Sequence, residues 1–583
     1  MEHPVLSRRS FVQRALAGAA AWPFRDLFQK PAKGAPETLY NGIVLPSPWP
    51  PRLRFASTEP LPPPYIVEPP EIIPIDVGRQ LFVDDFLIEE TTLSRTCHTA
   101  HYHPANPILK PETSWEMQDE YAGRTRTPPS PSAMVFSDGV FFDPADRRFK
   151  MWYMGGYLMS TCYAVSPDGV AWQRPKLDVR PNTNIVITDH RDSSTIWLDQ
   201  FDPDPTRRYK ATIWDDHHLE LFLSADGIHW RHVGRSGTAG DRSTFFYNPF
   251  RKVWVYSLRD AEAGSSVSDR FRRYREGANF EATAAWRDSD PVAWVKADRA
   301  DFARPESGGR PELYNLDCVA YESVLLGLFT IWRGETKQRE KINEVAAGFS
   351  RDGFHFSRPD RRALVPVSDR PGSWNFANVQ SAGGCCLIVG DQLYFYVSAR
   401  AGIPGTNFPG VCSTGLAILR RDGFASMDWL PNTAAARRLS GRVARPGELI
   451  TRPIRFNGRH LFVNVDAAGG SLKAEVLDRM GRVIQPYTLD ASVPVQTDTT
   501  RARLTWTARD DLSDLAGETV RFRFALTTGR LYAFWVSPWP SGESRGYVAA
   551  GGPEFRGPID ERHIPLRDSV TSRLQREPRD ASG

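Results

Sequence analysis

The sequence predicts an all-β protein, a five-bladed β-propeller followed by a C-terminal β-sandwich, from a repeated motif and from the point where the repetition stops. A Ser-x-Asp-Gly motif that closes on an aromatic residue recurs, in full or blurred form, at steps near sixty residues. Its five closing aromatic residues are Trp172, Trp230, Trp294, Phe356 and Trp429. Fixed-period repetition indicates one small sheet per repeat. Beyond Leu430 the period ends, and short alternating runs from Gly447 to Pro553 predict two packed antiparallel sheets.

Each copy of the motif predicts a tight turn that packs on a neighbouring sheet. Asp-Gly supplies the positive φ of such a turn, and the aromatic residue that follows is expected to wedge between sheets. The copies are Ser166–Trp172, Ser224–Trp230, Ser289–Trp294, Ser350–Phe356 and Arg421–Trp429. Two β-rich runs joined by a turn precede a typical copy, so each unit holds three or four strands. Such units repeated five times predict a propeller, whereas a linear array of sandwiches would not need equal spacing.

The N-terminus has the pattern of a twin-arginine export signal. Arg8 and Arg9 precede a weakly apolar stretch from Ala15 to Phe24, which is too short to span a bilayer. A basic first turn of a helix is the alternative interpretation. The pattern predicts export by the twin-arginine translocase to the periplasm or the extracellular space.

The expected domain bounds follow from these segments. They are a signal peptide at 1–30, a Pro-rich linker at 31–74, the propeller at 75–440, the β-sandwich at 441–556 and a charged flexible tail at 557–583. Proline blocks both sheet ladders and helices, so the linker is expected to be an extended tether.

Composition argues against several functional classes. A net charge of +4 on 583 residues gives no reason to expect a nucleic-acid partner. The six cysteines show no Cys-x-x-Cys spacing, so a zinc site is not expected. His101 and His103 share one face of a strand, but with no acidic or Cys neighbour they are better explained as solvated histidines than as metal ligands. We expect a monomer without a membrane span.

The five-unit pattern with a trailing sandwich resembles the glycosidases of the invertase, fructanase and arabinanase group. More specifically, the chain is similar to bacterial family 32-like glycosyl hydrolases. The matching stretches are Leu81–Ile88, Asn106-Pro107 with Trp115-Glu116, and Leu313–Asp317 with Tyr321–Ser323. The resemblance implies a carbohydrate substrate or ligand. It departs from the invertase pattern because the first unit lacks an Asn-Asp-Pro-Asn motif and the third lacks a Glu-Cys pair.

Glycosidases use two carboxyl groups, and in a propeller the polar groups at the starts of the inner strands converge on bound ligand. The second unit offers Asp192 and Asp199 at this position, and Asp199 is taken as its candidate. The candidate catalytic residues are Asp241, Glu312, Asp317, Asp199 and Glu116. The candidate substrate-binding residues are Trp115, Arg242, Tyr314, Asn315, Asn378 and Gln380.

Three of these acids carry specific expectations. Asp241 precedes Arg242, in the reverse order of the Arg-Asp pair that steadies the sugar in invertase-like enzymes, and an adjacent Arg keeps a carboxylate ionised. An ion pair in a surface turn explains the two residues equally well. Glu312 is expected near the proton donor, with a solvated loop Glu as the alternative. Asp317 lies between apolar neighbours, so it needs a partner or a role.

The leading hypothesis is an exported glycoside hydrolase that cleaves oligo- or polysaccharides by carboxylate acid/base catalysis. A non-catalytic carbohydrate-binding or scaffold propeller is the alternative. A sialidase-like hydrolase is a lesser alternative, which would need three Arg and a Tyr-Glu pair at the site. No cofactor is expected, and a structural calcium ion in the central channel is left open.

Overall fold

The computed structural model confirms that the protein is nearly all β. It describes residues 36–53, 55, 58–121, 124–125, 128–261, 270–406, 408–430 and 445–562. The α-helices within these ranges are α2 (Pro64–Val67) and α3 (Phe280–Ala284), neither of which is long or apolar enough to cross a bilayer. The proposed signal peptide and most of the tail expected at 557–583 lie outside the described residues.

Three consecutive antiparallel sheets occupy the middle of the chain, each with its strands in chain order. The first contains β15 (Ser194–Leu198), β16 (Tyr209–Asp215), β17 (His218–Ser224) and β18 (Arg231–Arg235). The second contains β19 (Thr244–Asn248), β20 (Val253–Ala261), β21 (Arg270–Gly277) and β22 (Val292–Lys296). The third contains β23 (Glu312–Glu322), β24 (Val324–Trp332), β25 (Asn343–Ser350) and β26 (Phe356–Ser357), with β39 (Tyr547–Val548) added beside β23.

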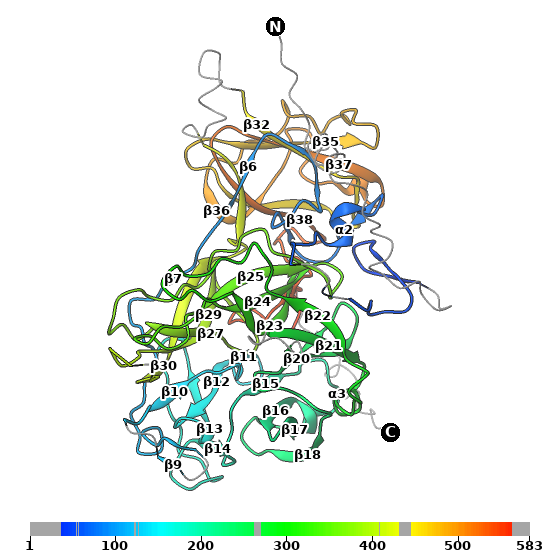
Figure 1. Cartoon of the computed structure of the whole chain (residues 1–583). Helices are drawn as coiled ribbons and strands as arrows, with labels where there is room; N and C mark the ends of the chain where they lie inside the picture. Colours follow the sequence, from blue (N-terminus) through cyan, green and yellow to red (C-terminus); the bar gives the residue numbers. More distant parts are fainter. Residues whose placement is uncertain are drawn as a thin grey trace, which may run out of the picture.

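A ten-stranded sheet joins the segments on either side of these three sheets (Figure 1). Its earlier half contains β10 (Ser132–Met134), β11 (Val140–Asp143), β12 (Arg148–Gly155), β13 (Ser160–Ser166) and β14 (Ile185–Ile187). Its later half contains β27 (Ala377–Ser381), β28 (Leu387–Val389), β29 (Gln392–Arg400) and β30 (Cys412–Arg420), with β7 (His101–Tyr102) beside β30. The two halves meet where β10 and β30 pair in parallel.

The Asp-Gly turns have the geometry expected from the motif. Gly169, Gly227 and Gly353 have φ values of +77°, +79° and +83°. In the turn that begins at Ser166, the serine Oγ accepts a hydrogen bond from Gly169 N at 2.9 Å. The Asp168 Oδ1 atom accepts bonds from the next two backbone amides, at 2.8 and 2.9 Å. The turns at Ser224 and Ser350 repeat this pattern.

Each of these turns also contacts another sheet, as the motif predicts. Trp152 Nε1 on β12 donates to Gly227 O at 2.7 Å, and Trp294 Nε1 on β22 donates to Phe354 O at 2.7 Å. Tyr396 on β29 donates to Gly169 O at 2.7 Å and packs edge-on against Trp172. These contacts connect consecutive units and also connect the last unit to the first.

Two six-stranded sheets form a second group with its own hydrophobic core. One contains β3 (Ile73–Pro74), β5 (Ile88–Thr91), β32 (Gly447–Thr451), β33 (Ile454–Arg455), β35 (Leu472–Asp478) and β37 (Thr519–Leu526). The other contains β4 (Gln80–Leu81), β6 (Ser94–Cys97), β31 (Ala425–Trp429), β34 (His460–Asp466), β36 (Asp498–Arg503) and β38 (Gly529–Ser537). The remaining short pairs are β1 (Glu37–Thr38) with β2 (Val44–Leu45), and β8 (Glu120–Tyr121) with β9 (Arg124–Thr125).

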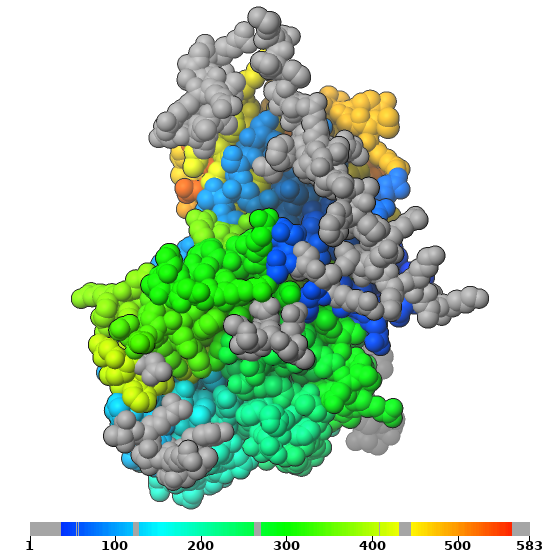
Figure 2. All heavy atoms as spheres, viewed as in Figure 1, coloured from blue at the N-terminus to red at the C-terminus, as the bar shows by residue number. Residues whose placement is uncertain are grey.

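The described part of the expected linker is not a tether, so that prediction is wrong. Leu39, Leu45, Tyr65 and Ile73 are buried in the core of the second group, and β3 pairs with β33. The prolines prevent long strands, but the apolar residues between them still need burial. In Figure 2 the upper part of the molecule accordingly shows blue N-terminal atoms beside yellow and orange C-terminal ones.

The boundary expected at 75–440 also needs correction at both ends. β4, β5 and β6 come before the first unit in the sequence, and β31 lies within the last copy of the motif, yet all four pair with strands of the second group. The second group is therefore built from both ends of the chain, and the chain crosses between the two groups three times, between β6 and β7, between β30 and β31, and between β38 and β39.

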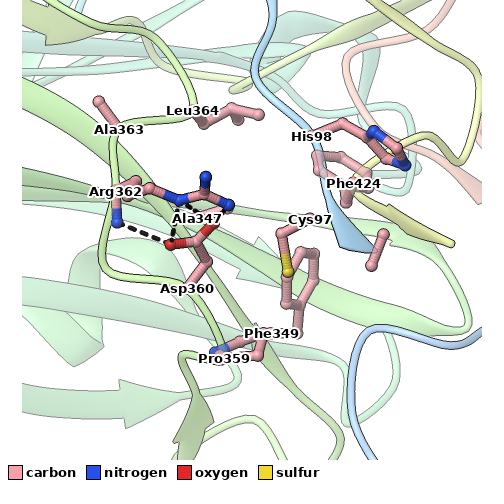
Figure 3. A pocket seen from close by; sticks show the side chains of 11 residues that line it. Cys97, His98, Ala347, Phe349, Pro359, Asp360, Arg362, Ala363, Leu364 and Phe424 are labelled. Atoms are coloured by element: carbon pink, nitrogen blue, oxygen red, sulfur yellow. Dashed lines mark hydrogen bonds and ion pairs between the residues drawn. The ribbon is translucent and has the colours of Figure 1, made fainter. Parts of the chain in front are cut away.

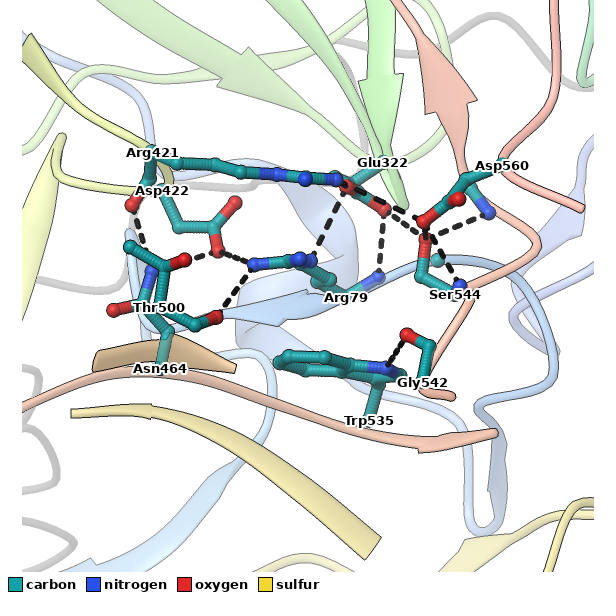
Figure 4. A network of polar contacts seen from close by, with 12 residues as sticks. Arg79, Glu322, Arg421, Asp422, Asn464, Thr500, Trp535, Gly542, Ser544 and Asp560 are labelled. Atoms are coloured by element: carbon teal, nitrogen blue, oxygen red, sulfur yellow. Dashed lines mark hydrogen bonds and ion pairs between the residues drawn. The ribbon is translucent and has the colours of Figure 1, made fainter. Parts of the chain in front are cut away.

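A buried network of charged residues lies where the two groups meet (Figure 4). Arg79 Nη1 donates to Asp422 Oδ2 at 2.8 Å and to Thr500 O at 2.9 Å, and its guanidinium lies 4.2 Å from the Trp535 ring centroid. The Glu322 carboxylate accepts hydrogen bonds from Arg421 Nη2 at 3.0 Å and from Ser544 Oγ at 2.6 Å. Because residues of both groups share these bonds, the network fixes one group against the other.

The contact between Gly227 and Trp152 predicts that a larger residue at position 227 destabilises the fold. A Cβ atom at Gly227 would lie 2.5 Å from Trp152 Cζ2, which is too close for an ordinary contact. Gly227 also has a positive φ, a backbone conformation that strains any other residue. Replacement Gly227→Ala is expected to lower the free energy of unfolding by about 2–4 kcal/mol, from backbone strain and overpacking together. Gly372→Ala is the matched control, since Gly372 has φ +80° and no atom lies within 4 Å of the position that a Cβ would take there. Chemical denaturation that finds equal losses for the two variants would contradict the packing role.

Candidate functional site

The edge strands of the first group contact one another in a closed circuit. β11 contacts β15, β15 contacts β19, β19 contacts β23, and β23 contacts β27. A parallel bridge between Gly139 and Gly383 connects the last edge strand back to the first. Residues on these strands, far apart in the sequence, therefore face a common centre.

A buried polar cluster occupies this centre around Asp317 on β23. Its Oδ2 atom accepts hydrogen bonds from Ser381 Oγ at 2.6 Å, Asn315 Nδ2 at 2.8 Å and Ser137 Oγ at 3.1 Å. Arg242 Nη2 donates to the same Ser137 hydroxyl at 2.8 Å. Burial raises the pKa of Asp317, while Ser381 and Arg242 oppose that rise. Sequence reasoning placed Asp317, Asn315 and Arg242 at the site, and the structure brings the three together.

A half-buried group of charged residues lies toward the starts of these strands, which we call the mouth. Asp192 precedes β15 and Asp241 precedes β19, and the two carboxylates repel each other electrostatically. Burial raises the pKa of Asp192, the Asp241 charge adds to the rise, and Arg242 and Lys341 oppose it. Arg259 forms an ion pair with Asp241 at 2.5 Å. The mouth thus holds two carboxyl groups in unlike surroundings.

The fourth unit also contributes residues near the mouth, since Lys341 acts electrostatically on Asp192. Glu312 is buried and forms an ion pair with Arg270 at 2.5 Å. The guanidinium of Arg270 lies 5.4 Å from the ring centroid of Tyr314. Lys341 Nζ donates to the Tyr314 hydroxyl at 3.2 Å. Glu312 is therefore not the solvated loop residue of the alternative interpretation.

The fifth unit contributes buried amides. The side-chain amide of Asn378 lies 2.6 Å from that of Asn343 and 2.7 Å from that of Gln380, against the guanidinium of Arg400. Arg400 in turn pairs with Glu340. Asn378 and Gln380 lie on β27, where the sequence placed them, but both are buried within the protein.

Asp199 lies at the other end of β15 from the mouth. It follows Leu198, the last residue of that strand. Its carboxylate accepts hydrogen bonds from Lys210 Nζ at 2.7 Å and from the backbone amide of Phe201 at 2.9 Å. These bonds explain it as the cap of the turn into β16. The repeat predicts that an Asp lies at an end of this strand, but the period alone does not tell which end of the strand lies at the mouth.

Trp115 lies next to the outer strand β14, whereas Glu116 contacts Tyr153 on β12 in the interior of the sheet. Trp115 Nε1 donates to Asn184 Oδ1 at 3.0 Å, next to β14. Glu116 is fully buried and accepts Tyr153 OH at 2.7 Å and Arg174 Nε at 2.8 Å. Burial opposes ionisation of Glu116, but the bonds from Arg174 and the backbone outweigh it and lower the pKa. Such a carboxylate is a poor proton donor.

The sequence reasoning missed Lys341, Ser137 and Ser381 and set Asp192 aside. A signal for Asp192 was present. Arg191-Asp192-Ser193 and Asp241-Arg242-Ser243 are Arg/Asp pairs in opposite order, each directly before an edge strand.

The central cluster does not suit a calcium ion. Calcium takes six to eight oxygen ligands, several of them carboxylates. Asp317 Oδ2 is already occupied by three donors, and the Arg242 guanidinium lies beside it. Among the described residues there is also no group of three or more His, Cys, Asp or Glu side chains that could hold a metal.

Two hollows lie outside the mouth. The one beside Cys97 and His98 has a volume of about 20 Å³, room for about one water molecule (Figure 3). The Asp360–Arg362 pair closes one of its sides. The second hollow, beside Tyr102 and Trp374, has a volume of about 460 Å³. Only the second has room for a sugar unit.

No family model matches the chain, and no curated protein matches its sequence. It is similar to the structure of an N-acetylgalactosamine deacetylase from F. plautii in complex with blood group B trisaccharide, at 15% identity and a TM-score of 0.38, over 54% of this chain and 97% of that one. It is also similar to a thermostable family-43 glycoside hydrolase, at 10% identity and a TM-score of 0.35, over 51% of this chain and 94% of that one. A third similar structure is a fructofuranosidase from Schwanniomyces occidentalis complexed with fructosylnystose, at 11% identity and a TM-score of 0.32, over 75% of this chain and 98% of that one. At TM-scores this low the likeness decides neither fold nor function.

The surroundings of Glu116 predict a structural role with a definite pH dependence. A carboxyl whose pKa is lowered on folding stabilises the protein above its unfolded pKa, and that contribution is lost as the pH falls. Glu116→Gln is expected to cost about 1.5–3 kcal/mol at pH 7, the usual worth of bonds to a charged group. Urea unfolding should show this loss shrinking in acid, below about pH 4.5.

The control for Glu116→Gln is Glu112→Gln, which removes the exposed partner of the same Arg174. It should cost less than about 1 kcal/mol. A Glu116→Gln loss of the same size at pH 7 and in acid would contradict the assignment.

Proposed function

We propose that this chain is an exported glycoside hydrolase-like protein, with a five-bladed β-propeller joined to a β-sandwich, that binds carbohydrate at the mouth. The closed circuit of edge strands supports the propeller, and the shared core of the two six-stranded sheets supports the sandwich. The twin-arginine pattern at Arg8 and Arg9 supports export.

The Asp192–Asp241 pair is the observation that carries the catalytic proposal. Hydrolysis of a glycosidic bond needs one carboxyl that gives a proton and one that acts as a base or nucleophile. Burial and the Asp241 charge raise the pKa of Asp192, which favours its protonated form. Arg259 forms an ion pair with Asp241, so a positive charge lies beside that carboxylate.

The reaction proposed at this pair conserves atoms and charge. Asp192 gives its proton to the glycosidic oxygen as the bond to the anomeric carbon breaks. Asp241 either takes a proton from the attacking water or first bonds to the anomeric carbon itself, and in both routes water supplies the new hydroxyl group. Lys341 and the Tyr314 hydroxyl, 3.2 Å apart at the mouth, are placed to bind sugar hydroxyls.

The three acids favoured from the sequence keep a part in this proposal. Asp241 remains a catalytic residue. Glu312, held by Arg270, and Asp317, held by three donors, act as positioning residues that fix Tyr314 and Ser137.

A non-catalytic carbohydrate-binding propeller is the second candidate. The central Asp317, Asn315 and Gln380 are each at most 3% exposed, so no ligand reaches the centre itself. Buried acceptor atoms of Asn315 and Gln380 have no partner among the described residues, which fits a role in holding ordered water. In that case the mouth binds sugar without cleaving it.

Sugar release from a polysaccharide panel by the purified mature protein tests the catalytic proposal. Asp192→Asn and Asp241→Asn are each expected to lower the rate about 10²–10⁴-fold, the usual worth of a positioned acid or base. In the wild type the rate should fall as the pH rises through the raised pKa of Asp192, since the proton donor is then lost.

Asp204→Asn is the matched control, because Asp204 is an exposed residue between β15 and β16, at the end of the same sheet that lies away from the mouth. It should leave the rate unchanged. Binding of sugar without release would favour the second candidate, whereas equal release by the wild type and both variants would overturn the assignment of the pair.

A further inference from the structure

We propose that the hollow beside Trp374 is a separate, non-catalytic binding site for a neutral carbohydrate. The hollow has a volume of about 460 Å³, within the range of small-ligand pockets. Tyr102 on β7 lines it together with residues of two loop segments, 103–106 and 366–375. The residues of the mouth do not line it.

The two aromatic side chains of the hollow form a fixed corner. The rings of Tyr102 and Trp374 meet edge to face, with centroids 5.5 Å apart. Tyr102 OH donates to Pro366 O at 2.7 Å, which holds the phenol. A Cβ atom at Gly415 on β30 would lie 1.9 Å from the Trp374 ring, so only glycine there leaves room for the indole. Aromatic faces held in place in this way bind with little loss of conformational freedom.

Polar groups beside the aromatic corner are suited to sugar hydroxyls. The Asn375 amide lies beside the Tyr102 hydroxyl, and the hydroxyls of Ser368 and Ser373 are 3.0 Å apart. The imidazole of half-buried His103 also lines the hollow. Amide and hydroxyl groups offer both donors and acceptors, as a sugar ring requires.

The charge of the hollow selects the ligand class. None of the described residues that line it is an Asp, Glu, Lys or Arg, in contrast to the mouth. The adjacent Arg339 and Asp369 form an ion pair with each other. An ionised sugar would therefore find no unpaired counter-charge among these residues, and desolvating it would cost free energy. The residues that line the hollow also lack the pair of carboxyl groups that glycosidases use for cleavage. It is therefore a binding site for neutral sugar units, whether or not the mouth is catalytic.

Native affinity electrophoresis of the full mature chain tests this inference. The probes are three neutral polysaccharides, arabinan, galactan and inulin, with polygalacturonate as the charged comparison. At least one neutral probe should retard the wild type, and Trp374→Ala should weaken that retardation at least about tenfold, as loss of a central aromatic contact does. His103→Ala, a smaller change at a half-buried residue, should weaken it in the same direction while leaving the fold intact.

Two controls separate this site from the mouth and from a general loss of structure. Asp192→Asn combined with Asp241→Asn should keep the retardation, because these residues do not line the hollow. Trp539→Ala, at a half-buried Trp beyond the end of β38, should also keep it. Retardation by none of the neutral probes, equal retardation of the wild type and both hollow variants, or loss of retardation only in the mouth variant would each overturn the proposal.

Discussion

The parallel pairing of β10 with β30 is the constraint on which the candidate site depends, because it places the first and last units of the repeat in one sheet. The Gly139–Gly383 bridge and the bond from Tyr396 to Gly169 act at the same junction. With the circuit closed, Asp192, Asp241 and Asp317, which belong to three different sheets, all lie within electrostatic reach of Arg242. Open stacking of the units would separate them.

The buried network at Arg79 shows how the second group of sheets contributes to the same end. Taking charges out of water is costly, and such a network is stable only when its groups are well paired. Burial raises the pKa of Glu322, and Arg421 and Arg79 oppose that rise. For Asp422 the same two arginines outweigh burial and lower the pKa. Asp422 lies two residues after the end of β30, and Glu322 is the last residue of β23. The network therefore connects the last unit with the fourth.

The parts of the fold that depend on local chemistry could be predicted from the sequence. The Asp-Gly turns were found because only residues that tolerate positive φ fit there, and their aromatic partners pack on other sheets as expected. The Pro-rich N-terminal segment was misjudged because burial of Tyr65 and Ile73 depends on strands contributed by the distant C-terminal part.

The candidate site could be predicted only in part, for a related reason. A repeat tells which strands face the centre but not which end of each strand forms the mouth, so Asp199 was favoured over Asp192. A fully buried arginine such as Arg272 could not be predicted from hydropathy either, because Arg side chains are mostly exposed in proteins. Trp115 and Glu116 match the resemblance in sequence, yet the structure places Trp115 next to the outer strand β14 and buries Glu116 against Tyr153 and Arg174.

The titration of Asp192 tests the central claim most directly, that carboxyl groups from separate sheets meet at the mouth. Carboxyl-carbon NMR of protein labelled at aspartate, with the Asp192 signal assigned from the Asp192→Asn spectrum, would measure its pKa. The account predicts a pKa above the ordinary value of about 3.9, and a decrease in that pKa when Asp241→Asn removes the neighbouring charge. An ordinary pKa that Asp241→Asn leaves unchanged would contradict it.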